Sequence, residues 1–190
     1  MRHFALPFAL LLLFSLLCLS CAREERHYVV GVSQCSEDIW RDKLNEELRM
    51  GEYYHSNLTL HIASANDNDR RQIAQIDEFI AQKVDLLIVS PNQLHTISPA
   101  IERAYAAKIP VILFDRKTDS KKYTAFIGAD NYEIGRTMGR YLALQLGGRG
   151  KVVEVMGLKG SSPAIERHRG MMEALKAYPE VKVVGHCHAD

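Results

Sequence analysis

The stretch that decides the fold class is Ala107-Lys108-Ile109-Pro110-Val111-Ile112-Leu113-Phe114-Asp115-Arg116. A proline follows the end of an expected helix, then a continuous apolar run begins, and two charged side chains close it. Runs of this kind belong to strands of parallel sheets that helices cover on both faces. Ligands of such sheets bind beyond the carboxyl ends of the strands, so Asp115 and Arg116 are the first candidate binding residues.

The chemistry of these two side chains suits a ligand with many hydroxyl groups. A carboxylate accepts hydroxyl protons, and a guanidinium offers five N–H donors in a fixed arrangement. The alternative is an ordinary ion pair in a loop, which is equally compatible with the two residues alone. The remaining strand ends are therefore needed to choose between a binding site and a loop contact.

The rest of the chain repeats the same strand–helix rhythm. Strands are expected at 28–33, 58–64, 85–90, 111–114 and 123–128, with helices at 39–50, 73–80, 94–107 and 132–146. Ser36 is a possible cap of the first helix, and Gly51 a plausible stop. Strict alternation with short connections predicts an α/β fold with a doubly wound parallel sheet.

A second set of elements follows the glycine-rich break at residues 147–150. A strand is expected at 151–156, a helix at 163–177, and a further strand begins at 181–184. These elements are too few to close a second layered unit. We therefore expect an amino-terminal lobe over residues 27–130 and the beginning of a second, truncated lobe over residues 131–190.

Residues 1–21 have the parts of an export signal. Arg2 precedes an uncharged apolar run from Phe4 to Leu19, and Ser20 then precedes Cys21. This arrangement resembles a lipoprotein signal in which Cys21 becomes the lipidated first residue. The alternative is an uncleaved membrane anchor, because the run approaches the roughly 20 apolar residues that a span needs. Either reading predicts a membrane-attached protein outside the cytoplasm, in the bacterial periplasm.

Charge and cysteine content exclude several classes of protein. The 24 basic and 23 acidic residues are interspersed, which gives no electrostatic case for binding nucleic acid. Outside the leader only Cys35 and Cys187 remain, too few for a disulfide scaffold. The run His186–His188 alternates faces on a strand and lacks a partner pair, and no phosphate-cradling glycine loop occurs. We expect neither a metal ion nor a cofactor.

Four motifs resemble the type-I periplasmic sugar-binding family, which includes ribose-binding and LacI-like proteins. They are Gly31–Ser36 followed by Trp40-Arg41, Asp115-Arg116-Lys117, Ile127–Gly135, and Pro163–His168. The first motif is more similar to the periplasmic sensor domains of Bacteroides-type hybrid two-component systems. The resemblance runs from about Tyr28 to the end of the chain.

This resemblance implies two lobes that close on a monosaccharide or small oligosaccharide. Trp40 would stack on the sugar ring, although its spacing with Leu44 and Leu48 also fits the core face of a helix. The ligand-binding positions that the family implies are Trp40, Ser90, Asn92, Asp115 and Arg116, and the hinge positions are Asp130 and Asn131. Asn92 could equally be a turn residue after Pro91.

One departure from the family concerns the second lobe. Relatives that bind ribose carry an arginine at the position of Ile165 here; Arg167 is retained two residues on, but on a helix it would point elsewhere, which favours a structural role. The sugar therefore need not be ribose. No catalytic residue is expected.

The resemblance implies a sensor input domain of a hybrid two-component histidine kinase. The alternative is the substrate-binding lipoprotein of a sugar ABC transporter, so the downstream partner is a kinase or a transporter. A remote alternative is a carboxylate-dependent enzyme, but it needs two placed carboxylates, and Asp130 falls in the hinge. A repressor's effector domain conflicts with the export signal.

Overall fold

A computed structural model describes residues 25–189. Its larger sheet has five strands in the order β2-β1-β3-β4-β5, and every neighbouring pair is parallel. The strands are β1 (Tyr28–Gln34), β2 (Leu58–Ser64), β3 (Leu86–Val89), β4 (Val111–Phe114) and β5 (Ala125–Ile127). The strand order places β3 at the centre between β1 and β4, and the residues of β3 and β4 are all apolar.

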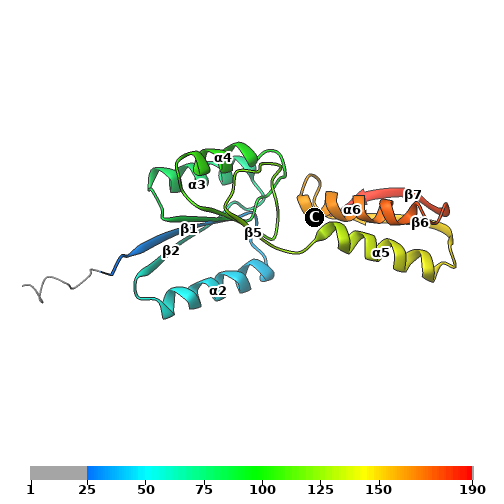
Figure 1. Ribbon diagram of the computed structural model, residues 1–190, viewed down its shortest axis with the longest axis horizontal. Helices are drawn as coiled ribbons and strands as arrows, with labels where there is room; N and C mark the ends of the chain where they lie inside the picture. Colours follow the sequence, from blue (N-terminus) through cyan, green and yellow to red (C-terminus); the bar gives the residue numbers. More distant parts are fainter. Residues whose placement is uncertain (1–24, 190) are drawn as a thin grey trace, which may run out of the picture.

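Helices cover this sheet on both faces (Figure 1). Helix α2 (Ile39–Tyr54) lies on one face, and α3 (Asp69–Ala81) and α4 (Ser98–Ala106) lie on the other. The predicted doubly wound parallel sheet is confirmed.

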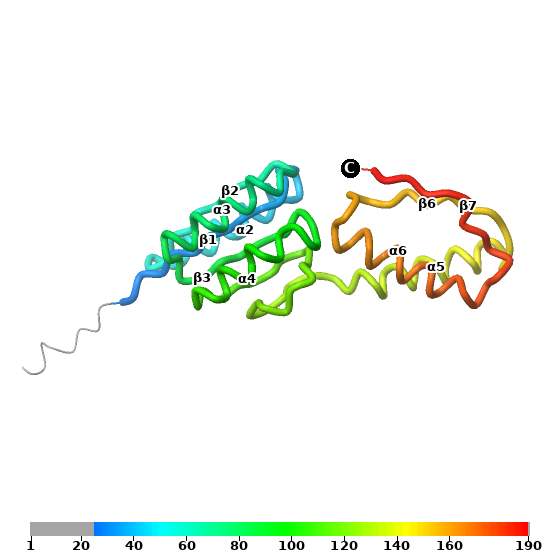
Figure 2. The backbone as a smooth tube through the Cα atoms, turned by 90° about the horizontal axis from the view of Figure 1, so that it is seen from above, coloured from blue at the N-terminus to red at the C-terminus, as the bar shows by residue number. Residues whose placement is uncertain are grey.

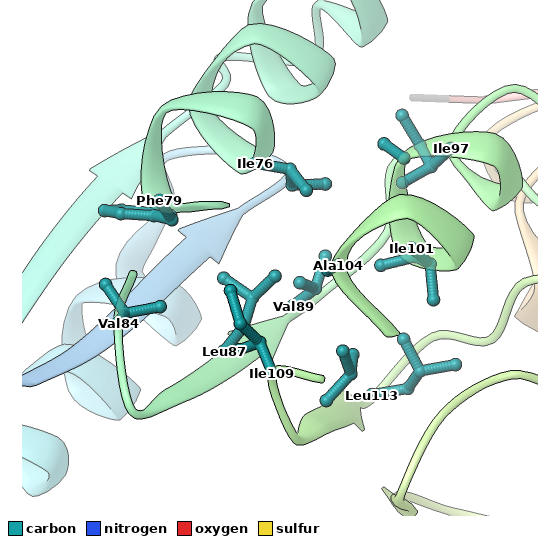
Figure 3. Packing of buried hydrophobic residues seen from close by; sticks show 12 residues of the cluster. Ile76, Phe79, Val84, Leu87, Val89, Ile97, Ile101, Ala104, Ile109 and Leu113 are labelled. Atoms are coloured by element: carbon teal, nitrogen blue, oxygen red, sulfur yellow. The ribbon is translucent and has the colours of Figure 1, made fainter. Parts of the chain in front are cut away.

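The core lies mainly between the sheet and helices α3 and α4 (Figure 3). Its fully buried members include Ile76, Leu87, Ile101, Val111 and Leu113. A smaller cluster around Val30, Val32 and Leu60 lies under α2. Because β4 contributes Val111 and Leu113 to the larger cluster, the residues that follow it are held on a rigid support.

A second unit follows residues 128–130. It consists of α5 (Asn131–Gln145), β6 (Arg149–Met156), α6 (Ser162–Leu175) and β7 (Glu180–His188), with β6 and β7 paired in parallel. Figures 1 and 2 show this unit beyond the carboxyl ends of the first sheet. The division of the chain into lobes at residue 130 stays a prediction.

Helices α5 and α6 approach each other closely at glycines. A Cβ atom on Gly135 would lie 2.0 Å from the carbonyl oxygen of Arg167, and one on Gly170 would lie 2.0 Å from that of Tyr132. Any side chain at either position would push the helices apart.

Three predicted boundaries are wrong. Helix α2 continues through Gly51 to Tyr54, because the turn that ends it is fixed by Glu52, whose carboxylate accepts the N–H of Leu60 at 2.8 Å. Its cap is Asp38 rather than Ser36. Helix α4 begins at Ser98 rather than at Leu94, whose N–H bonds to Gly160 in the second unit.

No helix within residues 25–189 is both long and apolar enough to span a membrane. The predicted leader over residues 1–21, with its lipidation residue Cys21, lies outside the described residues.

Candidate functional site

Asp115 follows β4 directly and has a left-handed backbone, with φ of 62°. Its N–H donates to the carbonyl oxygen of Ile127 at 2.8 Å, which ties the end of β4 to the end of β5. Aspartate adopts this backbone region more readily than most residues, but at a cost in free energy. Strained residues of this kind concentrate at binding and catalytic sites.

Arg41 pairs with this carboxylate from the first turn of α2. Its Nη2 atom lies 2.8 Å from Oδ2 of Asp115, and the arginine side chain is only 4% exposed whereas that of Asp115 is 34% exposed. Within residues 25–189, Nε and Nη1 of Arg41 have no hydrogen-bond partner. A buried guanidinium with unused donors is costly unless a further partner satisfies it.

Arg41 is a site residue that the sequence interpretation missed. It stands in the Trp40-Arg41 motif, but only Trp40 was assigned a role there. The signal that could have identified it is an arginine in the first turn of a helix, where the positive end of the helix dipole disfavours a cation. Such a residue needs a carboxylate partner, and Asp115 supplies it.

Trp40 lies beside this ion pair and is 52% exposed, so it is not a core residue of α2. Its ring centroid lies 5.9 Å from that of Phe114, and the guanidinium carbon of Arg41 lies 4.6 Å from its centroid. A cation over an indole fixes the ring, and the exposed part of the indole offers an apolar surface.

Arg116 and Asn92 meet next to Asp115. Nη1 of Arg116 lies 3.5 Å from the carbonyl oxygen of Asn92, and its Nε lies 3.9 Å from Oδ2 of Asp115. The amide of Asn92 donates to the carbonyl oxygen of Asp67 and to the carboxylate of Asp69. These bonds give Asn92 a structural role in the loop, while its buried Oδ1 has no partner within residues 25–189.

Ser90 lies deeper than the other candidates. It is 2% exposed, its hydroxyl lies 3.8 Å from Sγ of Cys35, and its carbonyl oxygen accepts from Nε2 of Gln72 at 2.8 Å. The structure therefore brings Trp40, Asp115 and Arg116 to the accessible end of the sheet and leaves Ser90 beneath them.

A cavity next to Asp115 and Arg116 lies mainly against the second unit. It has a volume of about 550 Å³ and is lined by Asp115 and Arg116 from the first unit and by α5, β6 and α6 from the second. Trp40, Arg41, Ser90 and Asn92 do not line this cavity, so the cavity adjoins the cluster around Trp40 and does not contain it. Arg167 lines the cavity, and its Nε also donates to Oδ1 of Asn131 at 2.8 Å.

The predicted hinge residues stand where the chain passes between the units. Asp130 is the cap of α5, and its carboxylate accepts the N–H of Glu133 at 2.9 Å. Asn131 is 3% exposed because Arg167 covers it. Both residues hold the start of α5, and their role as a hinge stays a prediction.

Loops of the first unit contact the second unit beside the cavity, at the start of α6 and at Gly160. Nζ of Lys117 lies 3.0 Å from Oε1 of Glu166, and the Lys117 N–H donates to Oγ of Ser162 at 2.7 Å. The Leu94 N–H donates to the carbonyl oxygen of Gly160 at 3.0 Å.

Two other features do not belong to this site. A larger cavity, of about 940 Å³, lies at the opposite, amino end of the first sheet. Within residues 25–189, no group of three or more histidine, cysteine or acidic side chains is placed to hold a metal ion.

Comparison with known proteins places the chain in a family. The family model described as periplasmic binding protein domain matches residues 30–190. The galactofuranose-binding protein YtfQ of Escherichia coli (strain K12) is 34% identical over 160 residues, which are 82% of this chain and 50% of that protein. The ribose import binding protein RbsB of the same organism is 29% identical over 63% of this chain and 40% of its own length.

Solved structures agree with the sequence matches. The fructose binding periplasmic domain of hybrid two component system BT1754 superposes with a TM-score of 0.82 at 46% identity, covering 86% of this chain and 54% of that one. A galactofuranose binding protein superposes with a TM-score of 0.75 at 33% identity over 86% of this chain and 56% of its own. The chain spans about half the length of the relatives it matches. The chain belongs to the family of periplasmic binding protein domains.

Proposed function

We propose that the chain belongs to a sugar-binding domain that closes on a small carbohydrate. The observation that carries the proposal is the Arg41–Asp115 ion pair beside the half-exposed Trp40, at the end of the sheet that faces the second unit. Charged groups of both signs recognise hydroxyls, and an indole recognises the apolar face of a sugar ring. The similar proteins are named as binders of fructose, galactofuranose and ribose.

The proposed ligand contacts are Trp40, Asp115, Arg116 and Arg41. Ser90 and Asn92 support the site from beneath: Ser90 is buried directly after β3, and the buried Oδ1 of Asn92, which has no partner within residues 25–189, is available to the ligand. Asp130 and Asn131 act as the hinge. Closure carries a signal only if the sugar binds the closed arrangement more tightly than the open one, and a ligand held by both units satisfies this condition.

The proposed role of the parent protein is that of a sugar sensor feeding a histidine kinase. The identity of 46% with the sensor domain of a hybrid two-component system supports this role. The second candidate is the binding component of a sugar ABC transporter, which the 34% identity with YtfQ favours. The named relatives are binding proteins, which supports a binding role over an enzymatic one.

The proposed location is outside the cytoplasm, as is usual for this family. Attachment to the membrane through residues 1–21, by lipid on Cys21 or by the apolar run itself, is part of the proposal.

A thermal-shift screen of the full-length protein against monosaccharides tests the proposal. A sugar present at a hundred times its dissociation constant should stabilise the protein by about 2.7 kcal/mol, which raises the melting temperature measurably. The screen should include fructose, ribose, arabinose and galactose.

The matched variants are Asp115→Asn and Asp77→Asn. Asp77 pairs with Arg103 between α3 and α4, away from the site. Asp115→Asn should abolish the shift, and Asp77→Asn should keep it. An unchanged shift in Asp115→Asn would falsify the assignment of the site.

A further inference from the structure

The large apolar side chains that the first unit exposes lie at its two ends. Ile39, Trp40 and Ile127 lie at the carboxyl end of the sheet, next to the second unit. The others lie at the amino end, and four of the five are tyrosines: Tyr28, Met50, Tyr53, Tyr54 and Tyr105. Figure 1 shows that this end, where β1 begins and α2 finishes, faces away from the second unit.

The cavity of about 940 Å³ opens at this same end. Its floor is apolar, with Val30, Leu58 and Ile109 among the lining residues. Three cations line it, Arg26, Lys83 and Lys108, against one carboxylate, Asp85, to which Arg26 is paired at 2.6 Å. We call the five apolar residues above together with these three cations the basal surface.

Two of these cations occupy backbone positions that favour glycine. Lys83 follows α3 with φ of 55°, and Lys108 follows α4 with φ of 65°. Glycine is the usual residue in this left-handed position after a helix, because it has no Cβ to clash. Each lysine is favoured by the negative end of the helix that it follows. That interaction does not explain why two lysines, rather than glycines, occupy strained backbone positions on the same surface.

The most apolar segment of the chain, which ends at Leu19, precedes the basal surface closely in sequence. Seven residue steps separate Leu19, the last residue of the uncharged run, from Arg26. At roughly 3.5 Å a step, the two cannot be more than about 25 Å apart. A membrane that holds the apolar run therefore lies close to Tyr28 and the residues around it.

We propose that the basal surface docks on a membrane containing anionic phospholipid, with its tyrosines at the headgroup level and Lys83 and Lys108 against lipid phosphates. Tyrosine is enriched at membrane–water interfaces, and basic side chains beside it are attracted to anionic lipid. This inference rests on the membrane attachment in the proposed function. The docking adds a second contact between the protein and the membrane, and this contact would hold the proposed sugar site on the side of the sheet away from the bilayer.

Hydrogen exchange of the full-length protein, with residues 1–24 retained, tests the docking. The protein is reconstituted in vesicles of phosphatidylcholine alone and of phosphatidylcholine mixed with phosphatidylglycerol, and attachment is verified by flotation. Exchange at residues 50–57 and 105–110 should slow in the anionic vesicles. Residues 39–43, at the other end of α2, serve as the internal control and should exchange equally in both.

The double variant Lys83→Gly/Lys108→Gly removes both charges and suits the left-handed backbone, so the fold is retained. Each lysine near an anionic bilayer is worth roughly a fivefold change in binding, so the docked fraction should collapse and the protection should disappear. The control Lys151→Gln/Lys182→Gln changes two neighbouring exposed lysines on β6 and β7 and should keep the protection.

Three outcomes overturn the docking. One is equal exchange in both kinds of vesicle, and another is protection that survives Lys83→Gly/Lys108→Gly. The third is protection without vesicles in a species of doubled mass, which assigns the surface to a second copy. Failure of flotation contradicts the proposed membrane attachment and the docking that rests on it, and it leaves sugar binding unaffected. Loss of the sugar-dependent thermal shift with protection intact contradicts sugar binding alone.

Discussion

At the scale of single residues, the site depends on a buried guanidinium that one carboxylate only partly satisfies. Arg41 is held by Asp115 and by the Trp40 ring, and two of its nitrogens have no partner within residues 25–189. The pair orients Asp115, whose carboxylate is the more exposed of the two groups. Asp115 and Arg116 could be predicted because they follow an apolar run directly. Arg41 stands out in the sequence only as a cation in the first turn of a helix, and its partner could not be predicted because it lies 74 residues away.

Arg41→Met should therefore lower sugar affinity by about tenfold or more, because a hydrogen bond to a charged group contributes roughly 1.5–3 kcal/mol. The measurement is titration calorimetry with the sugar that the thermal screen identifies. Arg103→Met removes an exposed arginine paired with Asp77 and should leave the affinity unchanged. Equal sugar affinities for Arg41→Met and Arg103→Met would show that Arg41 does not contribute to sugar binding.

Lys83→Gly should raise the free energy of unfolding by up to about 1 kcal/mol. Glycine relieves the left-handed strain at φ of 55°, and this gain exceeds the extra freedom that glycine gives the unfolded chain. Urea unfolding measures the change. A loss of stability would mean that the lysine makes a folding contact, which would weaken its assignment to a membrane surface.

At the scale of helices and strands, hydrophobic periodicity was sufficient to predict the alternation and the parallel sheet. It failed at helix ends, because single contacts between distant segments determine where those helices begin and end. Gly51 does not end α2, because Glu52 bonds to β2 beyond it. Leu94 does not begin α4, because its N–H is held by Gly160 of the second unit. Contacts of this kind leave no local pattern in the sequence.

The packing of α5 on α6 predicts opposite effects for two glycine substitutions. Gly135→Ala should destabilise the second unit by about 1–3 kcal/mol or more, since the new Cβ would overlap the Arg167 carbonyl. Gly51→Ala should stabilise α2 by about 1 kcal/mol, because its Cβ meets nothing within 4 Å and glycine is a poor helix former. Denaturant unfolding of both variants measures the difference, and a Gly135→Ala protein as stable as the parent would contradict the close approach.

The stability of the first sheet should fall in acid. The pKa of Asp85 is lowered from 3.8 by the Val29 N–H and by Arg26, which together join the starts of β1 and β3. A lowered pKa in the folded state stabilises the protein above the unfolded value, and that stability is lost as the pH falls below 3.8. Unfolding midpoints measured against pH should show this decline. The Asp85→Asn variant should be less stable than the parent at neutral pH, and its stability should fall less steeply as the pH is lowered. An identical pH dependence in both proteins would assign the loss of stability to other carboxylates.

At the scale of the whole molecule, the first sheet presents its two ends to different surroundings. The carboxyl end carries Asp115, Arg41 and Trp40 and faces the second unit, and the basal surface lies at the amino end. Lys117 and Leu94 bring loops of the first unit against the second. The sequence predicted which residues stand at strand ends, but not which contacts join the units, because the residues of each contact lie 45 or more positions apart in sequence.

The measurement that tests the central claim most directly is a sugar titration followed by Trp40 emission. The signal of Trp40 is the difference between the full-length protein and its Trp40→Phe variant, recorded with the sugar that stabilises the protein. We predict a saturable change with the same midpoint as binding, and its loss in Asp115→Asn. A sugar that binds without altering Trp40 emission, and that binds Asp115→Asn as tightly as the parent, would contradict the proposed site.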